Sequence, residues 1–335
     1  MRTLKNNDYK LFEQIVSLKQ PALLKTMSTY LKRHYGKVCT TKNYVYAVGD
    51  IPIALVAHLD TVFKDPVENI YYDERKNVMW SPEGLGADDR AGVFAIIKII
   101  RSGLKPHIIF TTDEEIGGLG AETLVKECPT PFAEMKYIIQ LDRRGTNDCV
   151  FYDCDNPKFV DYVELFGFTE AYGSFSDISE ICPIWGIAGV NLSIGYQNEH
   201  SIAETLHISP FLATIDKVIK MLNDANNAPS FKYIPNPYTT KWLPLKTQWS
   251  SDEWLNCFKC KHVFSEYELF PVKCLDGKTR FYCPDCVVDT VEWCEICGEA
   301  FEIDLDNPER KRCKDCRGGE IECSTLTKSK IVLNS

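Results

Sequence analysis

Histidine and acidic side chains recur in the first two thirds of the sequence, each time after a run of apolar residues. The segment AHLDTV (57–62) ends one such run with His58 and Asp60. Because successive side chains of a strand point to opposite faces, these two residues would share one face. The other candidates follow later apolar runs or lie in the loop GLGADDRAG: Asp88, Asp89, Asp113, Glu114, Glu115, Asp142 and His200. Taken singly, each is also compatible with a structural role, such as a helix cap or a solvated charge.

The chemistry that this set of residues points to is metal binding. Several carboxylates gathered at one edge of a sheet repel one another and raise one another's pKa values unless cations neutralise them. Two histidines among carboxylates form a ligand set that suits Zn²⁺, with Mn²⁺ or Co²⁺ as alternatives. The sequence therefore predicts a metal centre built from strand ends.

The elements that must position these residues alternate between strands and helices. Short apolar runs predict strands at 44–48, 51–57, 107–112, 137–141 and 187–195. Helical spacing of apolar residues predicts helices at 9–18, 22–34, 91–103, 118–127 and 209–225. This alternation predicts an α/β domain with a mostly parallel central sheet flanked by helices. Sites in such sheets form at the carboxyl ends of strands, which is where the candidate residues lie.

Length and composition restrict the class of protein. A chain of 335 residues is long enough for one large or two unequal domains, and its 44% apolar and 25% charged residues are ordinary for a soluble globular protein. The first thirty residues lack a secretory pattern, and no run approaches the roughly 20 apolar residues of a membrane span. We therefore expect a cytoplasmic protein. A formal charge of -9 argues against a general nucleic-acid binder.

The last part of the chain is rich in cysteine. Ten of the fifteen cysteines fall between Cys257 and Cys323, and eight of them form four CxxC pairs: Cys257/Cys260, Cys283/Cys286, Cys294/Cys297 and Cys313/Cys316. Without a signal peptide, such pairs are typical of metal ligands and predict two structural Cys₄ zinc sites in a zinc-ribbon-like, β-rich region. Sequential pairing is favoured over a cross-brace, which the short gap between the second and third pairs also allows.

The composition predicts four parts of the chain. We expect a domain at 1–222 that carries the candidate metal centre, a Pro/Asn-rich linker at 223–250, the cysteine-rich region at 251–325 and a tail at 326–335.

The order of the acidic motifs resembles the dizinc exopeptidase superfamily, which includes peptidase T and the leucyl and glutamyl aminopeptidases. The motifs are His-x-Asp at 58–60, Gly-Ala-Asp-Asp-Arg-Ala-Gly at 86–92, Asp-Glu-Glu-Ile-Gly at 113–117, then Asp142, then His200 with Glu204 four residues later. The resemblance covers about residues 10 to 222. It implies a zinc-dependent exopeptidase fold and hydrolysis of amide bonds in short peptides by a water that two zinc ions activate.

The resemblance also implies a role for each matching residue. The two metal ions would be held by His58, Asp88, Glu115, Asp142 and His200, with Asp88 bridging both. Asp60 would orient the imidazole of His58, and Glu114 would act as the general base. The peptide bond between Asp88 and Asp89 is expected to be cis. With the structural sites, the chain would hold two catalytic and two structural zinc ions.

The chain departs from the larger relatives in its spacing. Only 57 residues separate Asp142 from His200 and 27 separate Asp60 from Asp88, too few for the inserted domains of those relatives. We therefore expect a compact unit without a lid insertion. Arg143 and Arg144, next to the fourth ligand, and Asp177 in GSFSDISE are candidates for substrate contact.

Three functions remain open at this point. The first is an aminopeptidase acting on short peptides, and the second is a deacylase of N-acyl amino acids or another small-amide hydrolase. The third is a protein- or nucleic-acid-binding zinc-ribbon module with a vestigial hydrolase domain. The sequence argues against the vestigial domain of the third function, because all the metal ligands and Glu114 are retained. A protein partner for the cysteine-rich region and homo-oligomerisation are left open.

Overall fold

The computed structural model describes residues 3–236, 254–265, 269–274, 278–283, 286–287, 290–294 and 300–303. The chain divides into two units, Met1–Pro244 and Leu245–Ser335, and each is described here by itself.

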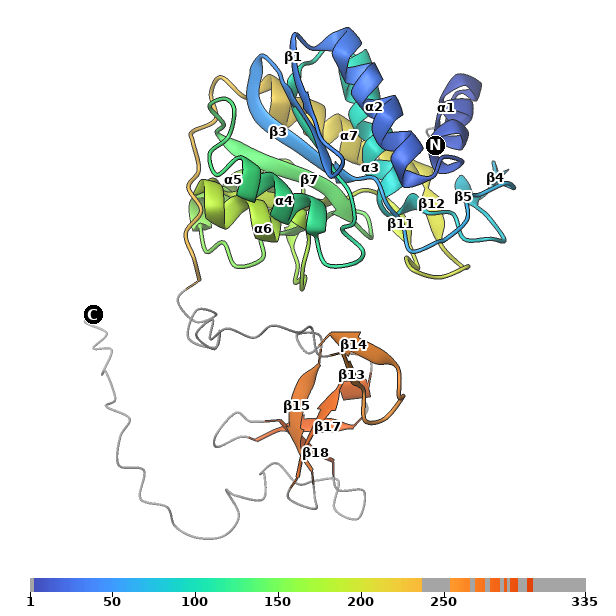
Figure 1. Ribbon diagram of the computed structural model, residues 1–335, viewed down its shortest axis with the longest axis vertical. Coiled ribbons are helices and arrows are strands. Elements are labelled where there is room, and N and C mark those ends of the chain that lie inside the picture. The colour runs from blue at the N-terminus through green and yellow to red at the C-terminus, as the bar shows by residue number, and fades with distance from the viewer. Residues whose placement is uncertain are drawn as a thin grey trace, which may run out of the picture. The chain divides into compact units, whose positions relative to one another are not determined.

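An eight-stranded sheet forms the centre of the first unit (Figure 1). Its strands, in spatial order, are β1 (Lys37–Thr40), β2 (Tyr44–Val48), β6 (Pro106–Thr111), β3 (Ile51–His58), β7 (Tyr137–Arg143), β10 (Gly189–Ser193), β8 (Asp148–Val150) and β9 (Thr169–Glu170). The four central strands, β6, β3, β7 and β10, are parallel to one another. β1, β2 and β8 add antiparallel pairs toward the edges. The predicted α/β class with a mostly parallel sheet is confirmed.

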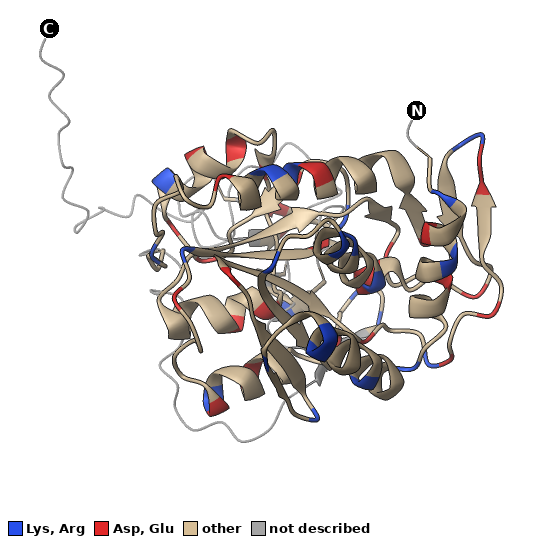
Figure 2. Cartoon of the chain, turned by 90° about the horizontal axis from the view of Figure 1, so that it is seen from above, with Lys and Arg blue, Asp and Glu red and all other residues tan. Residues whose placement is uncertain are grey.

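Helices cover both faces of this sheet. One face carries α3 (Ala87–Arg101) and α7 (Ile208–Asn223), with α1 (Asn6–Val16) and α2 (Gln20–His34) beside them. The other face carries α4 (Leu119–Glu127) and α6 (Asp177–Trp185). α5 (Pro157–Glu164) contributes its buried side chains to the first of these cores. Figure 2 shows the charged residues mostly on the helices and loops around a largely uncharged sheet.

Strand β3 shows why the sheet is buried on both faces. Ile53, Leu55 and Ala57 belong to one core cluster, whereas Ala54 and Val56 belong to the other. A near-continuous apolar run such as IPIALVA is what a central parallel strand requires, because neither of its faces meets water.

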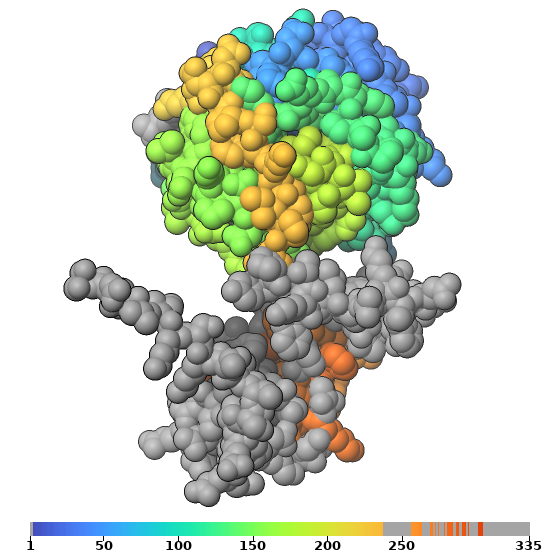
Figure 3. Space-filling view, turned by 90° about the vertical axis from the view of Figure 1, so that its left-hand side faces the viewer, coloured from blue at the N-terminus to red at the C-terminus, as the bar shows by residue number. Residues whose placement is uncertain are grey.

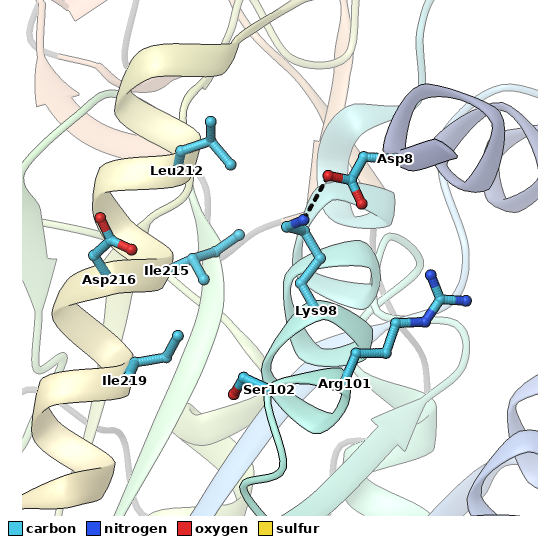
Figure 4. A pocket seen from close by; sticks show the side chains of 8 residues that line it. All are labelled: Asp8, Lys98, Arg101, Ser102, Leu212, Ile215, Asp216 and Ile219. Carbon is cyan, nitrogen blue, oxygen red and sulfur yellow. Dashed lines mark hydrogen bonds and ion pairs between the residues drawn. The ribbon is translucent and has the colours of Figure 1, made fainter. Parts of the chain in front are cut away.

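Helix α1 is held against α3 by packing and by an ion pair. The Phe12 and Phe94 rings lie 5.5 Å apart, and Asp8 and Lys98 form an ion pair of 2.7 Å. Figure 4 shows this pair beside α7, at a cavity of about 390 Å³. Among the described residues, none of the candidate metal ligands lines this cavity.

A second, four-stranded antiparallel sheet lies in the first unit. It consists of β11 (Tyr196–Gln197), β12 (Thr205–His207), β5 (Val78–Trp80) and β4 (Tyr71–Asp73). β11 and β12 pair, so the loop between them, which contains His200, begins and ends at this sheet. All residues between Asp142 and His200 are described. They form strands β8, β9, β10 and β11 of the two sheets and helices α5 and α6, rather than a separate lid domain.

The predicted linker is wrong at its start. Residues 223–236 pack on the first unit, where Ala225, Ala228 and Phe231 are buried in the core. Two isolated β-bridges, Ile187 with Lys232 and Cys154 with Pro235, hold the same segment. Figure 3 shows it as a gold strip along the surface of the unit. The segment belongs to the domain because apolar residues recur among its prolines and asparagines.

The described part of the second unit is β-rich, as predicted. β13 (Trp254–Asn256) pairs with β14 (Val263–Ser265). A four-stranded sheet contains β16 (Thr279–Tyr282), β15 (Phe270–Lys273), β18 (Ala300–Glu302) and β17 (Val291–Trp293). The predicted tail at 326–335 lies outside the described residues. None of the helices in the described part of the chain is long and apolar enough to cross a membrane.

Candidate metal centre

Three neighbouring parallel strands bring the candidate ligands together at their carboxyl ends. In the sheet register, His58 at the end of β3 pairs with Thr111 of β6, and Val56 pairs with Gln140 of β7. The residues that follow β6 and those at the end of β7 therefore lie on either side of His58. Two groups of potential ligand atoms form here, and within each group the atoms lie within 4.8 Å of one another.

The first ligand cluster consists of His58, Asp88 and Asp142. The Nε2 atom of His58 lies 3.2 Å from Oδ1 of Asp88 and 3.5 Å from Oδ1 of Asp142. The imidazole is almost completely buried. Burial alone would lower the pKa of His58, but Asp60 and Asp142 raise it well above its ordinary value. The surroundings thus favour positive charge at this point.

The second ligand cluster consists of Asp88, Glu115 and His200. The Nε2 atom of His200 lies 3.3 Å from Oδ2 of Asp88 and 2.9 Å from Oε2 of Glu115. Hydrogen bonds with Asp88 and Glu115 raise the pKa of His200 to about 11. Asp88 therefore presents Oδ1 to one cluster and Oδ2 to the other, which is the arrangement of a carboxylate shared by two metal sites.

Asp60 connects the motif of His58 with the motif that contains Glu115. Its Oδ1 atom lies 3.2 Å from Nδ1 of His58, and its Oδ2 atom accepts a hydrogen bond of 3.0 Å from the backbone N–H of Glu115. Asp60 thus faces the nitrogen of His58 that points away from the first cluster, the position of an orienting carboxylate.

Glu114 lies against the first cluster without being part of either group. Its Oε2 atom is 3.9 Å from Nε2 of His58. Burial raises the pKa of the Glu114 carboxyl well above its ordinary value, although His58 opposes this effect. A carboxyl group with a raised pKa suits acid–base work.

The start of α3 places Asp88. The Asp88–Asp89 peptide bond is cis, as the resemblance implied, and neither residue is helical. Asp89 accepts hydrogen bonds from the backbone N–H of Gly92 and of His58, so it joins the helix to the end of β3. Glu204, almost fully buried, accepts from the N–H groups of Ala87 and Asp88. Sequence reasoning assigned Glu204 no role, although its position four residues after His200 was a signal.

A buried polar network holds Asp142. Its Oδ2 atom accepts from Ser176 at 2.9 Å and from Gln140 at 3.0 Å, and its Oδ1 atom accepts from Tyr196 at 3.2 Å. Asn191 fixes the backbone of the same residue through both its N–H and its carbonyl oxygen. Sequence reasoning missed these partners, which come from strands and helices far apart in the chain.

The three residues predicted to contact substrate lie in different surroundings. Arg143 donates a hydrogen bond to the carbonyl oxygen of Tyr172, and Arg144 forms an exposed ion pair of 2.8 Å with Glu199. Asp177 is completely buried, which contradicts the expectation that it lines the substrate pocket. Its Oδ2 atom accepts a hydrogen bond of 2.6 Å from Thr111, and burial raises its pKa to about 7. Asp177 is the first residue of α6 and directly follows the N-cap residue Ser176.

The residues of both clusters fit metal ions. Within the described part of the chain, the ligand carboxylates form ion pairs with histidines and with no lysine or arginine. In the same part, the buried Oε1 atom of Glu115 has no hydrogen-bond partner. Two dications would neutralise the four carboxylates Asp88, Glu114, Glu115 and Asp142. Imidazole and carboxylate donors are those that Zn²⁺ accepts.

The α/β fold with its mostly parallel sheet is the fold of the zinc-dependent exopeptidases. Residues 40–158 match the family model described as Peptidase family M28. Together with the paired ligand clusters, this partial match supports a metal-dependent peptide hydrolase for the first unit. No curated protein sequence matches this chain.

Solved structures show the same fold. Aminopeptidase PepT from Bacillus cereus is 15% identical with a TM-score of 0.54, covering 65% of this chain and 98% of that chain. A tripeptidase from Staphylococcus aureus is 13% identical with a TM-score of 0.55, covering 66% and 98%. A TET aminopeptidase from a marine sediment archaeon of the Thaumarchaeota is 14% identical with a TM-score of 0.51, covering 65% and 97%. At this identity the likeness is one of fold.

A separate group of cysteines lies in the second unit. The sulfur atoms of Cys257, Cys260, Cys283 and Cys286 lie within 4.8 Å of one another, which is the sequential grouping of the first two CxxC pairs. The backbone N–H of Cys283 also points to the sulfur of Cys257 at 3.3 Å. Of the other predicted site, Cys294 is described, whereas Cys297, Cys313 and Cys316 lie outside the described residues.

We expect Cys260→Ser to remove about one tightly held zinc ion per chain and to leave peptide hydrolysis unchanged. Serine does not replace a thiolate ligand, and a Cys₄ site needs all four. Elemental analysis after dialysis measures the loss. Cys274→Ser is the matched control, because Cys274 is buried in the same unit but hydrogen-bonds to Tyr282 and lies outside the cluster. Equal zinc content in both variants would contradict a zinc site at the cluster.

Proposed function

We propose that this protein is an aminopeptidase that hydrolyses short peptides with a water activated between two zinc ions. The observation that carries the proposal is the sharing of Asp88 between two ligand triads. Metal pairs of this kind serve in aminopeptidases and other hydrolases. The first ion would be held by His58, Asp88 and Asp142, and the second by Asp88, Glu115 and His200.

The chain's own residues have distinct tasks in the reaction. Zinc ions bound here would supply Lewis acidity, which lowers the pKa of water toward neutrality. Glu114 takes the proton from the attacking water and returns it to the amine that leaves. Asp60 keeps the His58 ring oriented, and Glu204 holds the backbone at Asp88. Water attacks the carbonyl directly, so no acyl-enzyme forms.

The charge of the site favours a substrate with a free amine. Among the acidic groups buried around the ligands, Asp60 adds a negative charge: burial alone would raise its pKa, but His58 holds it below its ordinary value. The cationic side chain of Arg90 is also buried nearby. Its Nη1 atom donates hydrogen bonds to the backbone carbonyl oxygens of Ile15 and Leu18. Such surroundings attract an α-ammonium group, whereas an N-acyl amino acid brings only a negative charge.

Matched peptides test this proposal. The purified full chain should cleave dipeptides with a free amine at least about tenfold faster, in kcat/KM, than their N-acetylated forms, since a missing charge partner costs about that much. A chelator should abolish the activity, and added Zn²⁺ should restore it. Faster hydrolysis of the acetylated series would replace the aminopeptidase by the deacylase, our second candidate.

The remaining assignments are also proposals. We propose that Mn²⁺ or Co²⁺ can substitute for zinc at the catalytic clusters and that the second unit binds a protein partner. We also propose that the enzyme works in the cytoplasm, where thiols remain reduced and available to metal, and that it forms homo-oligomers.

A further inference from the structure

A second cavity, of about 490 Å³, opens beside the second ligand cluster. Asp60 and Glu115 form part of its wall, so it borders the metal centre. Much of the remaining lining is apolar and includes Leu18, Val62, Phe63, Val67, Leu85 and Ile116. Its volume lies in the range of about 300–1,000 Å³ that ligand pockets occupy.

One wall of the cavity is the turn between α1 and α2, and buried polar contacts hold it in place. Arg90 donates from Nη1 to the carbonyl oxygens of Ile15 and Leu18, at 2.9 Å each. Gln20 donates to Oδ1 of Asp113 at 2.7 Å and accepts from its N–H at 3.1 Å. This wall is therefore fixed to α3 and to the loop that carries Glu114.

The opposite wall is the segment that follows Asp60. Phe63 packs so closely on Gly84 that a Cβ atom there would lie 2.2 Å from the ring. Gly84 also has a φ of +90°, which disfavours other residues. The glycine of GLGADDRAG thus allows the Phe63 ring to pack directly against the loop that leads to Asp88.

The mouth of the cavity is open to solvent and has little net charge. Lys19, on the first wall, and Asp65, on the second, form an ion pair of 3.6 Å, with 64% and 91% of their side chains exposed. This pair joins the two walls while leaving both charged groups in water. Charged residues also line the cavity, among them Lys64, Arg90 and Asp113, but the apolar side chains named above give an apolar substrate group a surface to pack against.

We propose that this cavity is a substrate subsite that holds a large apolar side chain from one of the two residues flanking the cleaved bond. The inference rests on the peptidase function proposed above. Burial of such a side chain is worth about 1.5–3 kcal/mol, enough to discriminate between peptides. The cavity is preformed, so little of that gain is lost in ordering its walls.

Val62→Trp tests the subsite, because Val62 lines the cavity and is 42% exposed, so a larger side chain can be accommodated. A dipeptide matrix in which each position is alanine or phenylalanine gives the ratio of kcat/KM for phenylalanine over alanine. We expect this ratio to fall by at least about tenfold at one position, the scale of pocket discrimination by size. Leu165→Trp is the control, since Leu165 is 82% exposed and does not line the cavity.

The outcomes separate this inference from the proposed function. If the wild type cleaves no dipeptide, the peptidase proposal fails. If the wild type cleaves them and Val62→Trp keeps the wild-type ratio at both positions, the subsite is overturned. Inhibition by free phenylalanine is the second measurement, and its Ki should rise by at least about tenfold in the variant. Should Val62→Trp fail to fold, Ile116→Trp on the same cavity replaces it.

Discussion

Replacing Glu114 by glutamine is expected to lower kcat by about 10²–10⁴-fold while the metal ions stay bound, because the amide keeps the shape of the side chain but accepts no proton. The Glu114 carboxylate lies 3.9 Å from His58 and belongs to neither ligand triad. Steady-state kinetics with a free-amine dipeptide and elemental analysis of the same sample measure both parts of this expectation.

Glu115→Gln is the matched comparison for Glu114→Gln, since the same change is made one residue along. Glu115 contacts His200 at 2.9 Å within the second cluster. Replacing its anionic ligand atom by a neutral one should weaken the second metal ion and leave the first in place. The assignment of roles would be wrong if Glu114→Gln stayed active, or if it lost metal as readily as Glu115→Gln.

Asp88→Asn is expected to weaken both catalytic metal ions together. Each oxygen of Asp88 faces a different histidine, at 3.2 and 3.3 Å, so one substitution alters both clusters. The affinity of each ion should fall by more than the roughly 10–100-fold that follows the loss of an outer-shell partner. Zinc titration into chelator-treated protein should show two weakened binding steps, against one for Glu115→Gln.

Asp8→Asn serves as the control for this substitution. Asp8 pairs with Lys98 on α3, the helix whose N-terminal end also carries Asp88, but it lies outside both clusters. Retention of one wild-type binding step in Asp88→Asn would show that Asp88 serves a single ion and would remove the bridging role.

The central strands and the order of the ligands could be predicted because both depend on local patterns. The run IPIALVA predicts a strand buried on both faces, and β3 is one. The short strands were missed: β4, β5, β8 and β9 have two or three residues each, too few for a period to show. Their existence depends on pairing with distant segments, such as Trp80 with Thr205.

The residues that position the ligands could not be predicted for the same reason. Ser176 and Asn191 bond to Asp142 across 34 and 49 residues of sequence, and Glu204 bonds to Asp88 across 116. The sequence around a single serine, asparagine or glutamate contains no pattern that predicts such a distant contact. Asp177 misled the interpretation for the opposite reason: its loop matches a substrate-side segment, but the side chain turns into the protein toward Thr111.

The packing of residues 223–236 decides where an isolated peptidase fragment can end. Phe231 lies in an aromatic group with Tyr137, Phe159 and Tyr162, and Lys136 donates to the carbonyl oxygens of Ala225 and Ala228. Truncation after residue 222 would leave those rings facing water and Lys136 without its acceptors. A fragment that stops beyond residue 236 keeps them covered, so limited proteolysis should spare this stretch along with the catalytic unit.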